Sequence, residues 1–299
     1  MQLGYVGLGK MGKNMVLRLH EKNVNVVAWN RSQQPREVVS HVGVTTVEHL
    51  EDLPNKLASP RIIWLMLPAG EITDNAIQTL LPHISPGDLI IDGANSYYKD
   101  TLRRKEKVLK AEVRFMDIGV SGGPEGARNG ACLMIGGEKA DFNTLTPLFE
   151  KLSAPDAFGY FGQHGAGHFA KMVHNGIEYG MMQAIAEGAA VLNESPEFDL
   201  DLTEIFRVYN NKSVIESRLV GWTKNALEAD PKLVNISSKI NHSGEGEWTV
   251  KTAREYDIEV PIIETSLDVR KQSSQNSNSF RDKVVSAMRG QFGGHDVKS

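Results

Sequence analysis

The sequence predicts an α/β domain with a doubly wound, mostly parallel sheet, followed by an all-α domain. Three observations predict this order. The chain opens with a short apolar strand, a glycine-rich turn and a helix; buried-strand patterns recur as far as residue 135; and only helical periodicity follows from residue 167. Because 299 residues exceed one typical domain, we expect two, spanning residues 1–163 and 164–299.

Residues 3–29 read in order as strand, turn, helix and strand, and the turn has the sequence GLGKMG at residues 7–12. A GxGxxG motif in this setting is the fingerprint of a Rossmann-type dinucleotide-binding domain. Gly7 makes the tight turn, Gly9 lets the backbone approach a pyrophosphate, and Gly12 lets the helix pack on the strand. The N-terminus of the helix then faces the phosphates. A glycine-rich turn without a ligand is the alternative interpretation.

The residues after the second strand distinguish the two nicotinamide dinucleotides. Enzymes that use NAD usually place Asp or Glu there, where the carboxylate accepts from the ribose 2′-hydroxyl and repels a 2′-phosphate. This chain has Asn30, Arg31 and Ser32 instead. Arg31 can pair with a 2′-phosphate, and Ser32 can donate to it. The sequence therefore favours NADP and also admits NAD, with Arg31 as an ordinary solvated loop residue the alternative.

Three further buried strands each end in a loop rich in small or polar residues, and one more strand follows them. In doubly wound sheets, ligands bind at the carboxyl ends of the strands, so these loops are expected to hold cofactor and substrate. The strands are expected over residues 62–67, 89–91, 113–116 and 133–135, the last finishing the domain, and the loops over residues 68–70, 92–96 and 120–123.

The most informative stretch of the second domain is a helix expected over residues 167–193. Lys171, His174, Asn175 and Glu178 fall at i, i+3, i+4 and i+7, so they project from one face. Tyr179 lies at the edge of that face. A solvated helix face is the alternative, but such faces rarely combine an imidazole, an amide and a phenol. The opposite face carries small or apolar residues suited to burial: Val173, Gly176, Ile177, Gly180, Met181 and Ala184.

This polar face carries the groups that acid–base chemistry on a polyol needs. A neutral Lys171 can take a proton from a hydroxyl, and a protonated Glu178 can deliver one to a developing carbanion or enediolate. Lowering a lysine pKa from about 10.4 to about 7 takes roughly 4–5 kcal/mol, and partial burial and a nearby cation act in that direction. We therefore predict acid–base catalysis on a sugar-like substrate. Five further helices are expected over residues 202–209, 214–227, 247–255, 262–273 and 280–288.

Composition argues against several classes of function. A net charge of −4 and a pI of about 6.2 argue against general nucleic-acid binding. No segment approaches the ~18 consecutive apolar residues of a membrane span, and no secretion signal is visible, so we expect a cytoplasmic protein. The single Cys132 cannot form an internal disulfide and fits a reducing compartment. The nine histidines lack metal-ligand spacing, so no metal is expected.

With these loops and this helix in view, nearly the whole chain resembles the decarboxylating 6-phosphogluconate dehydrogenases of the pentose phosphate pathway, and its length matches their short form. The helix motif is the most specific, because the wider β-hydroxyacid dehydrogenases share the fold, an SGG loop and a catalytic lysine but not the HNGIEY continuation. The family's motifs occur in order: GLGKMG at 7–12, NRS at 30–32, LPAG at 67–70, IIDGANS at 90–96, VSGGPEGAR at 120–128 and KMVHNGIEYG at 171–180.

The resemblance implies a role for each matching residue. Lys171 is implied as the general base and Glu178 as the general acid. The implied cofactor contacts are Gly7, Gly9, Lys10, Met11, Gly12, Asn30, Arg31, Ser32, Leu67, Pro68, Ala69 and Asn95. The implied substrate contacts are Asn95, Ser121, Gly122, Gly123, His174, Asn175, Tyr179, Arg270, Arg289 and His295, with Tyr179 and Arg270 at the phosphate.

The implied reaction has three steps. Lys171 takes the C3 hydroxyl proton as hydride leaves C3, the resulting 3-keto acid loses CO2, and Glu178 helps to protonate the enediol to ribulose 5-phosphate. In long-form enzymes the counterparts of Arg289 and His295 reach the partner subunit's site, so a homodimer or homotetramer is expected. Glu247 departs from the pattern, because long forms commonly carry a phosphate-binding Lys there.

Two other functions compete with this hypothesis. A β-hydroxyacid dehydrogenase acting on a small unphosphorylated 3-hydroxy acid would not need Tyr179, Arg270 or Arg289. A non-catalytic nicotinamide-binding sensor would keep the fold but has no need of both Lys171 and Glu178 at catalytic spacing.

Overall fold

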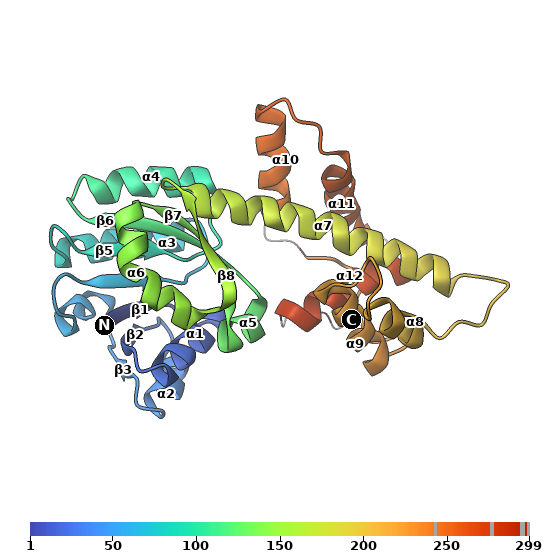
Figure 1. The fold of residues 1–299 in the computed structure, drawn as a ribbon, viewed down its shortest axis with the longest axis horizontal. Helices are drawn as coiled ribbons and strands as arrows, with labels where there is room; N and C mark the ends of the chain where they lie inside the picture. The colour runs from blue at the N-terminus through green and yellow to red at the C-terminus, as the bar shows by residue number, and fades with distance from the viewer. Residues whose placement is uncertain (242–243, 276–277, 294–296, 298–299) are drawn as a thin grey trace. The chain divides into compact units, whose positions relative to one another are not determined.

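The computed structural model describes residues 1–241, 244–275, 278–293 and 297. It divides into two compact units, Met1–Lys171 and Met172–Ser299. Figure 1 shows strands and helices in the first unit and helices in the second. Within the described ranges, no helix is long and apolar enough to cross a membrane. The domain boundary expected at residues 163/164 stays a prediction.

The first unit, every residue of which is described, is built on one eight-stranded sheet in the order β3-β2-β1-β4-β5-β6-β7-β8. Neighbouring strands are parallel except for the antiparallel pair β6 and β7. The order reverses between β1 and β4, which is where doubly wound sheets bind dinucleotides. The strands are β1 Gln2–Val6, β2 Asn25–Trp29, β3 Thr45–Thr46, β4 Ile62–Leu65, β5 Leu89–Asp92, β6 Arg114–Ser121, β7 Ala131–Gly137 and β8 Ser153–Gly162.

Helices cover both faces of this sheet, because its strands are apolar on both sides. Successive strand residues alternate between faces, so Tyr5 packs in one core with Met15 of α1, whereas Val6 packs in the other with Ile77 of α3. The predicted doubly wound α/β class is confirmed. The helices are α1 Lys10–Glu21, α2 Gln33–Ser40, α3 Glu71–Leu80, α4 Tyr98–Leu109, α5 Gly123–Asn129 and α6 Lys139–Leu152, with 3-10 turns at Leu50–Asp52, Pro54–Lys56 and Leu81–His83.

The regular elements of the second unit are all helices among its described residues, as predicted, and α7 begins in the first unit and continues into the second. Its core is formed by apolar residues that include Met182 of α7, Phe206 of α8, Val220 of α9 and Met288 of α12. The helices are α7 Ala166–Asn193, α8 Leu202–Tyr209, α9 Arg218–Ala229, α10 Glu245–Glu255, α11 Pro261–Gln272 and α12 Phe280–Gly293, with a 3-10 turn at Ser273–Gln275.

Three expected boundaries were wrong. The strand at residues 133–135 does not finish the domain, because α6 and β8 follow it and β8 pairs with β7. Strand β6 continues to Ser121, so the expected loop at 120–123 begins inside a strand. Helix α9 begins at Arg218 rather than residue 214, because the Ser217 side chain accepts from the Val220 amide and caps the helix.

Candidate functional site

The glycine-rich turn between β1 and α1 has the shape that its motif predicts. Gly7 has φ +104°, and a Cβ there would lie 2.3 Å from the Met66 carbonyl oxygen. A Cβ on Gly12 would lie 2.0 Å from the Gly7 carbonyl oxygen, so α1 must cross the turn at a glycine. Gly9 instead faces open space, with nothing within 4 Å of a Cβ, and it precedes the first turn of α1. An anion can therefore reach the N–H groups at the start of α1, where Lys10 and Met11 lie.

Asn30 ties this turn to the end of β2. Its side-chain oxygen accepts from the Leu8 amide at 2.9 Å, and its Nδ2 donates to the Ser32 carbonyl oxygen at 3.2 Å. Arg31 and Ser32 are exposed, and Ser32 is the residue that precedes α2. Asn30 thus shapes the loop that carries Arg31. Arg31 and Ser32 face solvent, where they are accessible to the 2′-phosphate of a bound cofactor.

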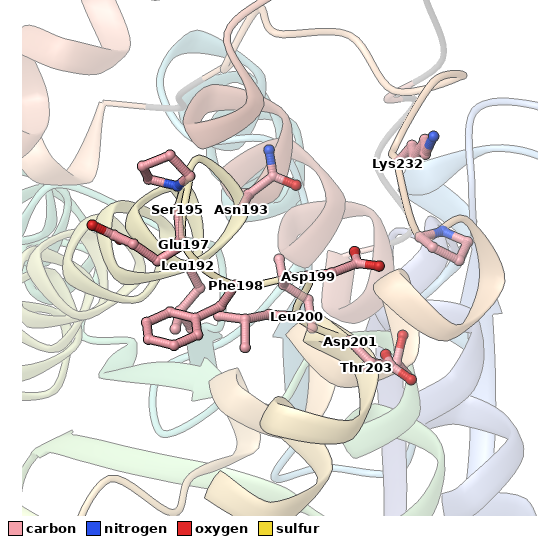
Figure 2. A pocket seen from close by; sticks show the side chains of 13 residues that line it. Leu192, Asn193, Ser195, Glu197, Phe198, Asp199, Leu200, Asp201, Thr203 and Lys232 are labelled. Atoms are coloured by element: carbon pink, nitrogen blue, oxygen red, sulfur yellow. The ribbon is translucent and has the colours of Figure 1, made fainter.

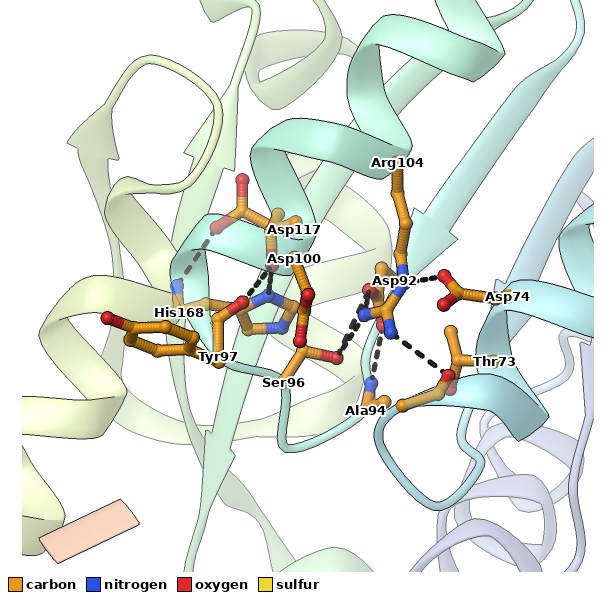
Figure 3. Close-up of polar contacts among 12 residues, drawn as sticks. Thr73, Asp74, Asp92, Ala94, Ser96, Tyr97, Asp100, Arg104, Asp117 and His168 are labelled. Atoms are coloured by element: carbon orange, nitrogen blue, oxygen red, sulfur yellow. Dashed lines mark hydrogen bonds and ion pairs between the residues drawn. The ribbon is translucent and has the colours of Figure 1, made fainter. Parts of the chain in front are cut away.

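A buried arginine joins the loops that follow β4 and β5. Arg104 of α4 is 2% exposed, and its Nη1 binds Asp92 at 3.0 Å and Ser96 at 2.7 Å. Its Nε donates to Asp74 of α3 at 2.7 Å, and its Nη2 donates to the Gly70 carbonyl oxygen at 3.1 Å (Figure 3). The network fixes the loops that carry Asn95 and the three residues Leu67, Pro68 and Ala69. Sequence reasoning missed Arg104, because a polar helix pattern does not distinguish it from its solvated neighbours.

Lys171 lies at the end of the first unit and is nearly buried, with 8% of its surface exposed. Its Cβ sits so close to Gly119 of β6 that a Cβ on that glycine would be 2.4 Å away. Burial raises the pKa of the Cys132 thiol on β7, and the charge of Lys171 lowers it, so the two groups are electrostatic neighbours. Cys132 pairs in register with Ser121, the last residue of β6. Lys171 is therefore held beside the strand that leads into Gly122 and Gly123 at the start of α5.

The polar face of α7 is not a solvated helix face. Asn175 and Tyr179 are buried, and Glu178 is partly buried. His174 is half-buried, with its Nδ1 2.9 Å from the Asn175 side-chain oxygen and 4.0 Å from a Glu178 carboxylate oxygen. The expected burial of the opposite face was wrong in part, because periodicity alone cannot say which stripe a neighbouring element covers. Gly176 and Gly180 are buried, but Ile177, Met181 and Ala184 are exposed.

Tyr179 and Arg270 form a buried pair in the second unit. The Arg270 guanidinium carbon lies 3.4 Å from the centre of the Tyr179 ring, and the ring packs on Gly246 of α10. Among the described residues, the Tyr179 hydroxyl and the Arg270 Nη1 have no hydrogen-bond partner, although both atoms are buried. Buried donors of this kind normally have acceptors, so the pair lacks one or more polar partners.

The surroundings of this pair carry both signs of charge. Burial lowers the pKa of Arg270 to about 10, the Tyr179, Glu178 and Glu245 charges raise it, and the Arg289 charge lowers it. Burial likewise raises the pKa of Tyr179. Arg289 is itself buried, within helix α12 rather than in a tail. Sequence position alone favours a solvated end for Arg289, but its side chain is buried and its charge acts on Arg270.

Glu247, at the position where long forms commonly carry Lys, is exposed, and its carboxylate pairs with Lys271 Nζ at 3.3 Å. Its charge is thus directed to a surface cation. His295 lies outside the described residues.

A cavity of about 480 Å³ lies elsewhere in the second unit, where α7 leads into α8 (Figure 2). Residues 192, 193 and 195–203 line it together with Pro231 and Lys232, and none of the predicted site residues is among them. Across the described parts of the chain, no group of three or more His, Cys, Asp or Glu side chains could hold a metal ion.

Comparison with known proteins agrees with these features. Residues 2–165 match the family model for the NAD binding domain of 6-phosphogluconate dehydrogenase, and residues 167–298 match the model for its C-terminal domain. The chain belongs to the 6-phosphogluconate dehydrogenase family. Its first unit thus carries the family's nucleotide-binding domain.

Individual relatives cover the whole chain. An NAD(+)-dependent, decarboxylating 6-phosphogluconate dehydrogenase of Haloferax volcanii is 37% identical, covering 99% of this chain and 98% of its own length. The solved Plasmodium falciparum 6-phosphogluconate dehydrogenase, described with NADP+ and with 6-phosphogluconate, is 29% identical with a TM-score of 0.83, covering 98% of this chain and 70% of that one. Mycobacterium tuberculosis 3-hydroxyisobutyrate dehydrogenase, 18% identical with a TM-score of 0.75 over 96% of this chain and 99% of that one, shares the fold.

Proposed function

We propose that this enzyme catalyses the oxidative decarboxylation of 6-phospho-D-gluconate to D-ribulose 5-phosphate and CO2, with reduction of NADP or NAD. The observation that carries the proposal is the buried pair of Tyr179 and Arg270. These two buried donors have no acceptor among the described residues, and the charge of a second buried arginine, Arg289, also acts there; such a site suits a phosphate group, whose oxygens accept several hydrogen bonds. A small unphosphorylated acid would leave these donors unpaired.

The helix α7 supplies the proposed acid and base. Lys171 Nζ takes the proton from the C3 hydroxyl, and the bound nicotinamide supplies the acceptor for the C3 hydride. The 3-keto acid then breaks its C1–C2 bond, and the electron pair moves onto the C3 oxygen as an enediolate while CO2 leaves. The proton that Lys171 took from the hydroxyl returns to this oxygen and gives the enediol. Glu178 delivers a proton to the enediol carbon. His174, Asn175, Asn95 and the loop at residues 121–123 are proposed to hold the gluconate hydroxyls and carboxylate.

The cofactor preference is proposed to rest on the exposed loop after β2. Gly7, Gly9, Lys10, Met11 and Gly12 would hold the pyrophosphate. Leu67, Pro68 and Ala69 would border the nicotinamide end. Arg31 and Ser32 would meet the 2′-phosphate, while Asn30 holds their loop in place.

Replacing Arg31 should therefore alter only the choice of cofactor. We expect Arg31→Ala to lower kcat/KM for NADP by about 10–100-fold, because one charge-assisted pair is worth roughly 1.5–3 kcal/mol. The value for NAD should change by less than about twofold, which makes NAD the control within the same variant. Equal losses with both cofactors would instead assign Arg31 to shaping the loop.

We further propose a cytoplasmic homodimer or homotetramer. The charge of Arg289 acts on Arg270 of the same chain, which supports a phosphate contact for Arg289 within its own subunit. His295 is proposed as a substrate contact, either in the site of its own subunit or in that of a partner subunit.

Substrate comparison tests the proposal against its competitors. Initial rates with 6-phosphogluconate, gluconate and 3-hydroxyisobutyrate should show turnover of the first alone at micromolar to low millimolar concentrations. Preference for an unphosphorylated 3-hydroxy acid would favour the β-hydroxyacid dehydrogenase. Nucleotide binding without turnover of any of the three would favour the sensor.

A further inference from the structure

A buried carboxylate fastens the first turn of α7 to the sheet. Asp117 of β6 is fully buried, and its two oxygens accept from the amide of Gly165 at 2.6 Å and the amide of His168 at 2.9 Å. The first N–H groups of a helix lack acceptors within the helix, and a negative charge there is favoured by the helix dipole. Asp117 thus serves as the cap of α7, although it lies 48 residues before Gly165 in the sequence.

A second bond fastens the same turn from another side. The Nδ1 of His168 lies 2.7 Å from the hydroxyl oxygen of Thr101 on α4, and both residues are buried. Figure 3 shows His168 beside Asp117 at this point. The start of α7 is therefore held to β6 and to α4 together.

Glycines let α7 approach the sheet closely enough for these bonds. A Cβ on Gly167 of α7 would lie 2.4 Å from the Met134 carbonyl oxygen, and a Cβ on Gly136 of β7 would lie 2.7 Å from the Asp117 carboxylate. A Cβ on Gly119 would collide with Lys171, as described above. The helix thus has no room to move toward the sheet at any of these points.

Asp117, Gly119 and Ser121 alternate along β6, so their side chains share one face of the strand. On that face Asp117 caps α7, and the side chain of Lys171 packs against Gly119. The strand then leads into the loop proposed to hold substrate. Lys171 follows His168 by three residues, which is less than one helical turn. A shift of the capped turn would therefore move Lys171 relative to Ser121.

We propose that Asp117 is a positioning residue for Lys171: by capping α7 on β6, its carboxylate sets where the lysine amine lies along the strand that leads into the substrate loop. The inference rests on the proposed role of Lys171 as the base. Asp117 does not touch substrate in this account. It acts through the backbone of residues 165–168.

The test replaces Asp117 by Asn, which keeps the size but can accept through one atom only. A misplacement of about 1 Å can reduce a rate by about 10²-fold, so we expect kcat with 6-phosphogluconate to fall about 10–100-fold. KM for NADP should stay within about twofold. Amide hydrogen exchange of residues 165–171 should accelerate.

Asp88→Asn is the matched control. Asp88 is also buried and accepts two backbone amides, from Arg61 at 2.6 Å and Ser85 at 2.9 Å, but it lies before β5, at the opposite end of that strand from the Asn95 loop. The Asp88→Asn variant should lose about as much thermal stability as Asp117→Asn but keep the wild-type kcat. If both variants lose stability but neither loses kcat per folded molecule, the positioning role is wrong.

Two further measurements keep the result decisive. If Asp117→Asn does not fold, Thr101→Val removes the second fastening more gently and should lower kcat about two- to fivefold without changing KM for NADP; an unchanged kcat would contradict the proposal. If the wild-type enzyme does not turn over 6-phosphogluconate, the proposed function fails first. The exchange experiment then still tests the cap, and unchanged exchange at residues 165–171 would overturn it separately.

Discussion

Lys171→Met is expected to lower kcat for 6-phosphogluconate oxidation by about 10²–10⁴-fold, because general-base catalysis contributes about that much. Methionine approximates the length of lysine and tolerates the burial of this position, but it cannot take a proton. The glycine-rich turn lies far from residue 171 in the sequence, so nucleotide affinity should stay within about twofold. Initial rates and a fluorescence titration with the reduced cofactor measure the two quantities.

Lys139→Met is the control for this variant. Lys139 lies in the same unit, where its Nζ is 4.3 Å from the ring centres of Phe142 and Tyr160, and it has no proposed role in the site. It should keep more than half of the wild-type kcat. A Lys171→Met enzyme that retained a tenth or more of its rate would remove this lysine as the base.

Arg270→Met is expected to lower kcat/KM for 6-phosphogluconate by about 10²–10³-fold. Removing one partner of a buried charge pair costs about 2–5 kcal/mol, and most of the loss should appear in KM because the phosphate is remote from the reacting carbons. Inorganic phosphate should raise the Tm of the wild-type protein and have a smaller effect on the variant. Arg254→Met, which removes an exposed arginine of the same unit, should behave as wild type in both assays.

The stability of the Arg270 variant should move in the opposite direction from its activity. Burial lowers the pKa of this guanidinium to about 10 in the folded protein, well below its ordinary value, so the folded state holds the proton less tightly. Burial of the charge therefore destabilises the folded state fully below about pH 10, and this destabilisation fades as the pH rises above the folded-state pKa. This destabilisation by the buried charge amounts to about 3 kcal/mol. The contact with the Tyr179 ring offsets part of it, by about 0.5–2 kcal/mol.

At neutral pH, Arg270→Met should consequently unfold at the same temperature as the wild type or a higher one. A drop in Tm of several degrees without ligand would mean that Arg270 stabilises the fold, and its effect on KM could then not be assigned to the phosphate. In this account the positive charge of Arg270 is stabilised by a bound anion and not by the ligand-free fold.

The local features of the site could be predicted wherever residues close together in the sequence determine the structure. The turn around Gly7 and Gly12 is specified by backbone contacts that only glycine permits, so the glycine motif predicts it. The periodicity of α7 likewise placed Lys171, His174 and Glu178 on one face. Such arguments need only residues that are neighbours in the sequence or share one helix.

The remaining features depend on partners distant in the sequence. Asp117 and Arg104 act on segments that packing brings to them, and the sequence shows Asp117 only as an aspartate directly after the strand expected at residues 113–116. Strand β8 was missed because its residues are only partly buried and include Pro155 and Asp156, the latter with φ +57°. Which face of α7 is covered is also a property of its neighbours, as the exposed Met181 shows.

The most direct test of the central claim measures reduced nicotinamide and evolved CO2 in the same reaction with 6-phosphogluconate, using NADP and NAD in parallel. The account predicts equal molar yields of the two products with either cofactor, and a faster reaction with NADP. Reduced cofactor without CO2 would identify a dehydrogenase that does not decarboxylate. No product with either cofactor, from protein that binds nucleotide, would contradict the account.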